Sequence, residues 1–269
     1  MHPDILSAFG GEMEKIAGDE SRWGELIVDA PGAKLTKKDV FDYYSEPRIR
    51  NAILAQVKDR EVIVRQSFTP AQVILKRKEK GNFIRINRAG DDVNDPSDLS
   101  YFTERRMTEI HPVFRKNEDK LIVDLDPRPE FPFEDTKSYA AEISSFMKKV
   151  PGVGSSEVRY SGGRGFYVVG HLKSPVHVDK GRELLKTHLA PLLDADERLT
   201  MGVPQSDGQM RLDLSTFKER GSLRGLYSLN ATTGLVSVPV KDVATFDPRK
   251  DATIEAVLGR KPKAARHAR

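Results

Sequence analysis

The segment that most constrains this chain is Lys120–Pro127, where an apolar run carries Asp124 and Asp126 and ends at a proline. Alternate side chains of a β-strand point to the same face, so the two carboxylates would share one face while Val123 and Leu125 face the core. Neighbouring carboxylates repel each other unless a cation lies between them, and hard oxygen ligands suit Mg²⁺ or Mn²⁺. Aspartates that cap turns, phosphohydrolases and sugar-nucleotide transferases share this pattern, so it does not identify a function alone.

The amino-acid composition excludes several classes of protein to which this chain could belong. With 269 residues, 31% charged and 38% hydrophobic, the chain can bury a full core and is typical of a globular protein. Its net charge of +4 is compatible with a polyanionic partner. Cysteine is absent, which excludes disulfides, cysteine-ligated zinc, iron–sulfur clusters and thiol catalysis. No apolar run approaches about 18 residues and no signal peptide is evident, so we expect no membrane span and a cytoplasmic location.

Strand and helix patterns interleave without a regular βαβ period, which predicts the α+β (mixed α/β) class. The expected helices cover part of 1–30, and 36–44, 134–150 and 182–193. The expected strands, besides that of the Asp pair, are 62–64, 73–75, 83–86, 157–160, 166–169, 211–214 and 234–239, with a loop over 89–100. We divide the chain into an N-terminal helical segment (1–34), a catalytic domain (35–258) and a basic, disordered tail (259–269).

A glycine-rich turn, Ser161–Gly165, is expected between two of these strands. Glycines let backbone N–H groups approach an anion, and Arg164 supplies a fork of donors that matches phosphate oxygens. Such a loop alone is more often an ordinary hairpin. Asp213 lies in a short apolar strand further along the chain, where it is either a third metal-binding carboxylate or a turn residue. Basic residues are concentrated just after it, over 218–224.

In this order the motifs resemble those of the archaeo-eukaryotic primase superfamily. The resemblance implies a primase-polymerase core with an RRM-like antiparallel or mixed sheet flanked by helices. It also implies that Asp124, Asp126 and Asp213 are catalytic and bind two Mg²⁺ or Mn²⁺ ions. Ser161 and Arg164 match the second motif, which contacts the nucleotide.

Two stretches are similar to particular members of that superfamily. Residues 35–44 look like the opening of the polymerase domain of end-joining DNA ligases, where a lysine at the position of Lys37 helps to hold a 5′-phosphate. His111 matches a histidine of that subfamily that approaches the nucleotide phosphates, and 227–239 resembles the small catalytic subunit of archaeal and eukaryotic primases. The nucleotide contacts expected are His111, Ser161, Gly163, Arg164, Gly165, Tyr167, Lys218, Arg224 and Asn230. The DNA contacts expected are Lys37, Lys38, Lys76 and Lys78.

Two residues depart from the family pattern. Tyr167 and Asn230 stand where histidines are usual, and neither a phenol nor an amide can carry the positive charge of an imidazolium. The sequence therefore predicts a template-directed nucleotidyltransferase that acts on a DNA template and primer with NTPs or dNTPs. A catalytically degenerate nucleic-acid or nucleotide-binding protein of the same fold remains the alternative, and a phosphohydrolase with Asp124 as nucleophile ranks last. The partners expected are a primase large subunit, or a ligase and an end-binding protein.

Overall fold

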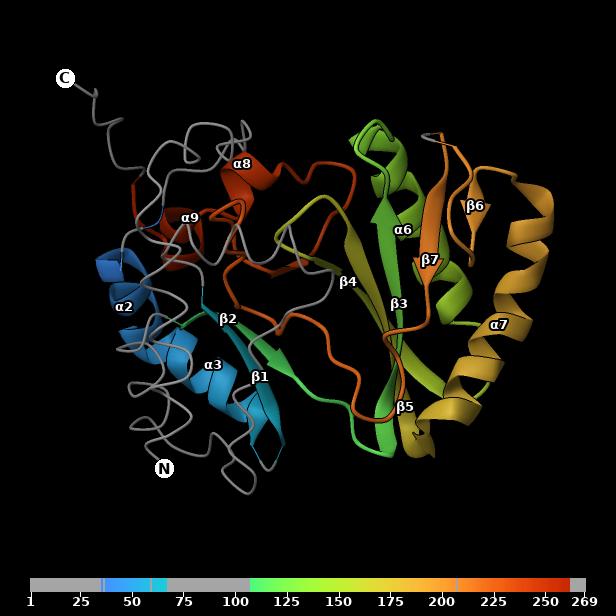
Figure 1. The fold of residues 1–269 in the computed structure, drawn as a ribbon, viewed down its shortest axis with the longest axis horizontal. Helices are drawn as coiled ribbons and strands as arrows, with labels where there is room; N and C mark the ends of the chain where they lie inside the picture. Colours follow the sequence, from blue (N-terminus) through green and yellow to red (C-terminus); the bar gives the residue numbers. More distant parts are fainter. Residues whose placement is uncertain (1–34, 36, 59, 67–106, 207, 262–269) are drawn as a thin grey trace, which may run out of the picture.

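The computed structural model describes residues 35, 37–58, 60–66, 107–206 and 208–261, which form an α+β fold with a six-stranded and a two-stranded sheet (Figure 1). The elements in chain order are α2 (Lys37–Ser45), α3 (Pro47–Val57), β1 (Val62–Gln66), β2 (Met107–Pro112), β3 (Asn117–Pro127), α6 (Phe133–Met147), β4 (Val153–Tyr160), β5 (Phe166–His177), α7 (Val178–Ala195), β6 (Leu199–Thr200), β7 (Met210–Asp213), β8 (Val238–Val240), α8 (Pro248–Asp251) and α9 (Ile254–Leu258). The predicted fold class is confirmed.

The larger sheet is built around β3, in the strand order β6-β7-β3-β5-β4-β8. β3 pairs antiparallel with β5 on one side and with β7 on the other, whereas β6 runs parallel to β7. Helix α6 packs against β3, β4 and β5, and α7 packs against β3, β5 and β6. The sheet is thus mixed and flanked by helices.

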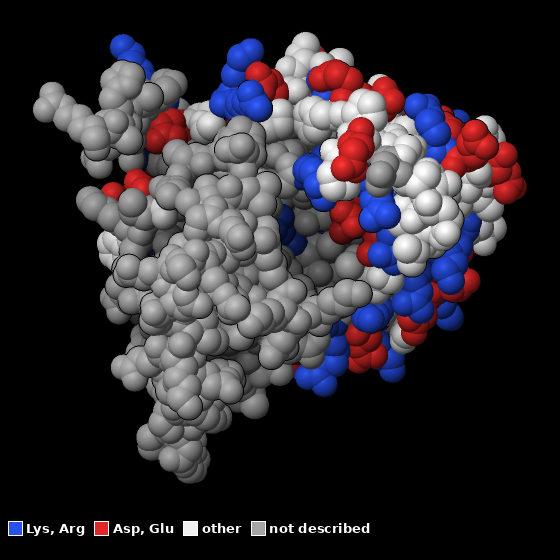
Figure 2. Space-filling model, turned by 45° about the horizontal axis from the view of Figure 1, so that its top comes forward, with Lys and Arg blue, Asp and Glu red and all other residues white. Residues whose placement is uncertain are grey.

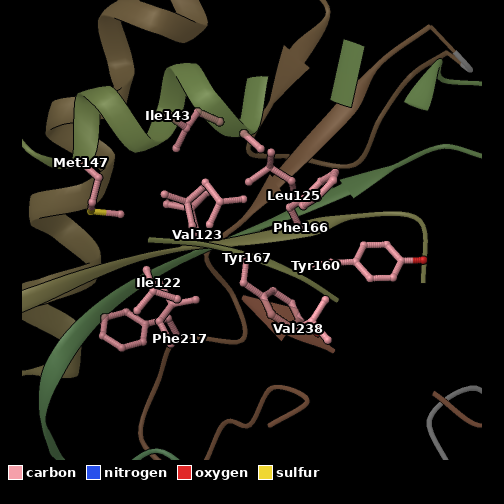
Figure 3. Packing of buried hydrophobic residues seen from close by; sticks show 14 of the residues in the cluster. Ile122, Val123, Leu125, Ile143, Met147, Tyr160, Phe166, Tyr167, Phe217 and Val238 are labelled. Atoms are coloured by element: carbon pink, nitrogen blue, oxygen red, sulfur yellow. The ribbon is translucent and has the colours of Figure 1, made fainter. Parts of the chain in front are cut away.

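The alternation of side chains along β3 separates the core from the opposite face of the sheet. Leu121, Val123 and Leu125 have no solvent exposure, because they point toward the helices. Figure 3 shows Val123 and Leu125 on the same side of the sheet as Ile143 of α6, while Ile122 points the other way. We call the side away from α6 the carboxylate face; on β3 it carries Lys120, Ile122, Asp124 and Asp126.

The two-stranded sheet β1–β2 and helices α2 and α3 form the part of the described fold that lies beside the larger sheet (Figure 1). Tyr44 of α2 is buried, and its hydroxyl donates a hydrogen bond to the Thr108 carbonyl at 2.6 Å. The same hydroxyl accepts one from the Leu229 N–H at 3.0 Å. One phenol therefore joins α2, β2 and the C-terminal segment.

The structure corrects several expected boundaries. The helix predicted over 134–150 is 133–147, and the strands predicted at 157–160 and 166–169 extend to 153–160 and 166–177. The strand predicted over 234–239 is wrong for most of its length, because only 238–240 pairs with β4. Five elements were not predicted: α3, β2, β6, α8 and α9. The expected N-terminal helix, the strands at 73–75 and 83–86, the loop over 89–100 and tail residues 262–269 lie outside the described residues.

In the described part of the chain, no helix combines the length and the apolar character that a membrane crossing needs.

Candidate active site

Three aspartates meet on the carboxylate face. Asp124 of β3 lies directly opposite Asp213 of β7 in the antiparallel register, and Asp126 lies opposite Arg211. Side chains opposite each other on paired strands share a face, with Cβ atoms about 5 Å apart. Asp126 is two residues from Asp124 and therefore shares that face as well. The structure thus brings together the three carboxylates predicted from the sequence.

Burial and neighbouring negative charge raise the proton affinity of the two β3 carboxylates. The pKa of Asp124 is raised well above its usual range by burial, then by the negative charges of Asp126 and Asp213. Burial also raises the pKa of Asp126, while the nearby Arg164 guanidinium acts in the opposite direction. Carboxylates held this way favour a cation or a proton nearby.

Asp213 is already partly engaged. Its Oδ1 accepts the Ser215 N–H at 2.7 Å and lies 3.3 Å from Nη2 of Arg211. In the part of the chain that the structure describes, no three or more His, Cys, Asp or Glu side chains are arranged as a group that could hold a metal ion. The carboxylates therefore share a face without forming a finished coordination set.

The loop Ser161–Gly165 joins β4 to β5 and closes as a turn, with the Ser161 N–H bonded to the Gly165 carbonyl at 3.1 Å. Gly165 has to be a glycine, because a Cβ there would lie 1.9 Å from the carbonyl oxygen of Leu125 on β3. This close approach brings the loop against the strand that carries Asp126. Arg164 at the loop's tip is exposed.

Within this loop the Gly163 N–H bonds to Oγ of Ser161 at 3.3 Å, and the Gly163 carbonyl accepts the Tyr160 hydroxyl. Gly162 adopts a positive φ of 82°, a backbone conformation that favours glycine. The loop is therefore held both by its own backbone and by β4.

Tyr167 is the neighbour of Asp124 on β5, directly opposite it in the register. Its side chain is buried, and Figure 3 shows it on the same side of the sheet as Ile122. Burial, followed by the negative charge of Asp124, raises the pKa of the Tyr167 phenol above its usual range. Tyr167 is therefore a neutral hydrogen-bonding group next to the carboxylates.

A buried carboxylate, Glu109 of β2, connects two of the predicted nucleotide contacts. Its Oε2 lies 2.8 Å from Nε2 of His111 and 3.2 Å from Nη2 of Arg224, and its Oε1 accepts the Ala231 N–H at 2.8 Å. Arg224 also donates from Nη1 to the Ser161 carbonyl at 2.5 Å. His111, Arg224 and the glycine loop thus form one connected cluster, centred on Glu109.

Glu109 was missed by the sequence reasoning, although a signal was present. Glu109 and His111 are two residues apart on β2, so they lie on the same face of that strand. An acidic residue that shares a strand face with a candidate phosphate ligand is a natural partner for it. The spacing alone gave no reason to expect that Arg224 would join them.

Asn230 lies beside the glycine loop but is occupied with a turn. Its Oδ1 accepts the N–H groups of Thr232 at 2.8 Å and Thr233 at 3.3 Å. A Cβ on Gly162 would come within 3.1 Å of the Asn230 Cβ. Asn230 therefore packs against the loop and shapes the chain around it.

The remaining predicted contacts are not part of this cluster. Lys218 is exposed, and no contact joins it to the glycine loop or to Arg224 among the described residues. Lys37 and Lys38 begin α2, but their side chains, like all of Lys76 and Lys78, lie outside the described part of the chain. On the face drawn in Figure 2, basic and acidic side chains of the described residues are interspersed. The predicted DNA contacts remain predictions.

Comparison with known proteins identifies the family of this domain. Residues 36–266 match the family model of the LigD primase-polymerase domain. No curated protein sequence matches the chain. Among solved structures, the polymerase domain of Mycobacterium tuberculosis Ligase D in complex with DNA matches with a TM-score of 0.67 and 17% sequence identity, over 86% of this chain and 92% of that chain. These matches confirm the resemblance to the archaeo-eukaryotic primase superfamily, and the chain belongs to the LigD primase-polymerase domain family.

Proposed function

We propose that this protein is a template-directed nucleotidyltransferase that adds nucleotides to a primer 3′-hydroxyl on DNA. The observation that carries the proposal is the position of Asp124 opposite Asp213, with Asp126 on the same face and with both β3 carboxyls raised in pKa. Membership in the LigD primase-polymerase family supports the same activity. A broken or gapped DNA end is the substrate that this family membership favours.

The side-chain chemistry of these residues suits a pair of divalent cations, although the described residues are not arranged as a finished metal site. Three carboxylates lie on one face, and two of them are destabilised as anions by burial and by neighbouring aspartates. They supply the hard oxygen donors that Mg²⁺ and Mn²⁺ prefer. Asp124, Asp126 and Asp213 would hold the ions. Bound ions supply charge neutralisation for the attacking 3′-oxygen and for the pyrophosphate leaving group.

The protein's own groups position the nucleotide. Arg224, fixed between Glu109 and the Ser161 carbonyl, directs its charge toward the phosphates, and His111 is held from the same carboxylate. Arg164 and the backbone N–H groups of the glycine loop would bind phosphate oxygens next to Asp126. The 3′-oxygen forms a bond to the α-phosphorus while the bond to pyrophosphate breaks, so catalysis comes from positioning and electrostatics rather than from a covalent intermediate.

Primer extension with Mg²⁺ or Mn²⁺ tests the proposal. Asp124→Asn and Asp213→Asn are expected to lower incorporation at least about 100-fold while binding of primed DNA is kept. Asp119→Asn is the matched control, because this exposed carboxylate lies on the same strand. Undiminished incorporation by either active-site variant contradicts the assignment.

A second function, nucleotide and DNA binding without catalysis, is favoured by two observations. Tyr167 is uncharged beside Asp124, and the carbonyl oxygen of Asn230 is committed to a turn. The same assay separates the two proposals, with ribo- and deoxyribonucleotides offered on templates with and without primer. If the protein binds nucleotide but forms no product with either Mg²⁺ or Mn²⁺, it is a binding protein without catalytic activity.

A further inference from the structure

A small cavity lies on the carboxylate face, further along β3 from the aspartates. Its volume is about 60 Å³. That is room for roughly four water-sized spheres, comparable with the four oxygens of a phosphate group. Ile122, Tyr167 and Val169 line it from the sheet, while Phe114 and the segment 223–225 line it from the other side. The cavity is therefore a bounded site for a small group.

Its lining is strongly basic, with four cationic side chains: Arg60, Lys120, Arg159 and Arg224. The three arginines each have a carboxylate partner: Arg60 with Glu118 at 2.5 Å, Arg159 with Glu157 and Arg224 with Glu109 at 3.2 Å. Each of these arginines therefore already has one carboxylate counter-charge within the protein.

Lys120 differs from these arginines. Among the described residues its ammonium group has no hydrogen-bond or ion-pair partner, although Lys120 is partly buried. Burial lowers the pKa of Lys120, and the positive charge of Arg159 lowers it further. Both terminal nitrogens of Arg60 donate hydrogen bonds to Glu118, so Glu118 does not form an ion pair with Lys120. An anion in the cavity would supply the missing partner.

The cavity adjoins the candidate active site. Tyr167 lines the cavity and is opposite Asp124 in the sheet register, and Arg224 lines it while also contacting the Ser161 carbonyl. Lys120 and Asp124 lie on the same face of β3, roughly 13 Å apart along the strand. A triphosphate bound at the aspartates would extend toward Lys120, and the side chain of Lys120 would extend toward the aspartates. Together they span this distance along β3.

We propose that Lys120, supported by Arg159, forms a subsite for the terminal phosphate of the incoming nucleoside triphosphate and for the pyrophosphate that is released. This inference rests on the proposed nucleotidyltransferase function. A terminal phosphate suits the site better than a strand backbone does, because a terminal phosphate is a dianion at neutral pH, whereas a backbone phosphodiester carries a single charge.

The test measures equilibrium binding of inorganic pyrophosphate, dATP and dAMP to the full chain, with Lys120→Met against wild type. Lys120→Met removes the charge and keeps an unbranched side chain of similar length. We expect pyrophosphate and dATP to bind at least about tenfold more weakly while dAMP binding is unchanged, and Lys120→Arg to restore most of the loss. Lys116→Met is the control, because Lys116 is an exposed lysine just before β3.

Three results overturn the inference. In one, dAMP and dATP lose affinity equally; in another, neither pyrophosphate nor dATP binding changes. In the third, binding of primed DNA falls while dATP binding is kept, which assigns the cavity to a nucleic-acid phosphate. Thermal unfolding of each variant identifies a loss that comes from misfolding. Because the readout is binding, a protein that binds dATP through Lys120 but incorporates nothing supports the subsite and refutes only the polymerase function.

Discussion

Glu109 and Arg224 form a buried ion pair, with Oε2 of Glu109 3.2 Å from Nη2 of Arg224 and both side chains almost fully shielded from solvent. Because the same carboxylate contacts His111 of its own strand and the Ala231 N–H, one residue of β2 sets the positions of groups from that strand and from the distant segment 224–231. Glu109 is thus a positioning residue for the proposed phosphate contacts.

Replacing Glu109 with Gln tests this role. The amide keeps the shape of the side chain but holds Arg224 and His111 less firmly than the carboxylate does, so we expect the KM for dATP to rise about tenfold with a smaller effect on kcat. The free energy of unfolding should fall by about 1–3 kcal/mol. Steady-state kinetics and urea unfolding measure the two effects. A variant that loses stability while its KM for dATP is unchanged shows that Glu109 is structural only.

Gly165→Ala should be among the most damaging single substitutions in the described part of the domain. Its Cβ would lie 1.9 Å from the Leu125 carbonyl oxygen, so either β3 or the loop has to move. We expect a loss of at least about 3 kcal/mol of stability, together with loss of nucleotide binding. Gly202→Ala is the control, since the nearest atom to its Cβ would be 3.5 Å away. Equal melting temperatures for the two variants contradict this prediction.

The carboxylate face could be predicted from the sequence in part. Alternation along 120–127 fixed the strand and the shared face of Asp124 and Asp126, because the period of two is a local property. The pairing of Asp124 with Asp213 depends on the register between β3 and β7, which no spacing within one segment encodes. Only the resemblance to known primases linked the two segments.

The segment 234–239 shows why local pattern failed elsewhere. Its apolar residues suit a strand, but β-propensity is mostly a matter of which neighbours are available. Here Val236 forms an isolated bridge with Leu229, and only 238–240 reaches the edge of β4. The Glu109 cluster escaped prediction for a similar reason, because it is assembled from β2, Arg224 and the loop before Thr232.

The ion pair of Arg60 with Glu118 should contribute strongly to stability, because it joins the end of α3 to the start of β3. Nη1 and Nη2 of Arg60 lie 2.5 and 3.0 Å from the two Glu118 oxygens, and Glu118 also accepts the Arg115 N–H at 2.6 Å. Removing one partner leaves a buried charge, so Arg60→Met should cost about 3–5 kcal/mol. A double-mutant cycle with Glu118→Gln measures the coupling. Additive losses in that cycle would mean that the two charges act independently.

Lys120 should give the protein a pH-dependent stability above neutrality. The pKa of Lys120 is lowered in the fold, so its charged form is disfavoured in the folded state. Between that lowered pKa and 10.5, the ordinary value, the unfolded chain binds more protons, and stability rises with pH. Lys120→Met should therefore be stabilising at pH 7, with a gain that shrinks as the pH approaches 10. Urea unfolding of both proteins at the two pH values measures this, and a gain independent of pH argues against it.

Tyr167 offers a direct test of whether the missing imidazole limits activity. Tyr167→His places a group that can be positively charged opposite Asp124 in the sheet, where burial keeps the native phenol neutral. We expect dATP to bind about three- to tenfold more tightly, because a charged donor strengthens a hydrogen bond to phosphate. Tyr167→Phe is the matched variant, since it removes only the hydroxyl, and it should weaken dATP binding by about threefold if the phenol contacts phosphate. Weaker binding by Tyr167→His than by Tyr167→Phe would show that the site has adapted to a neutral residue here.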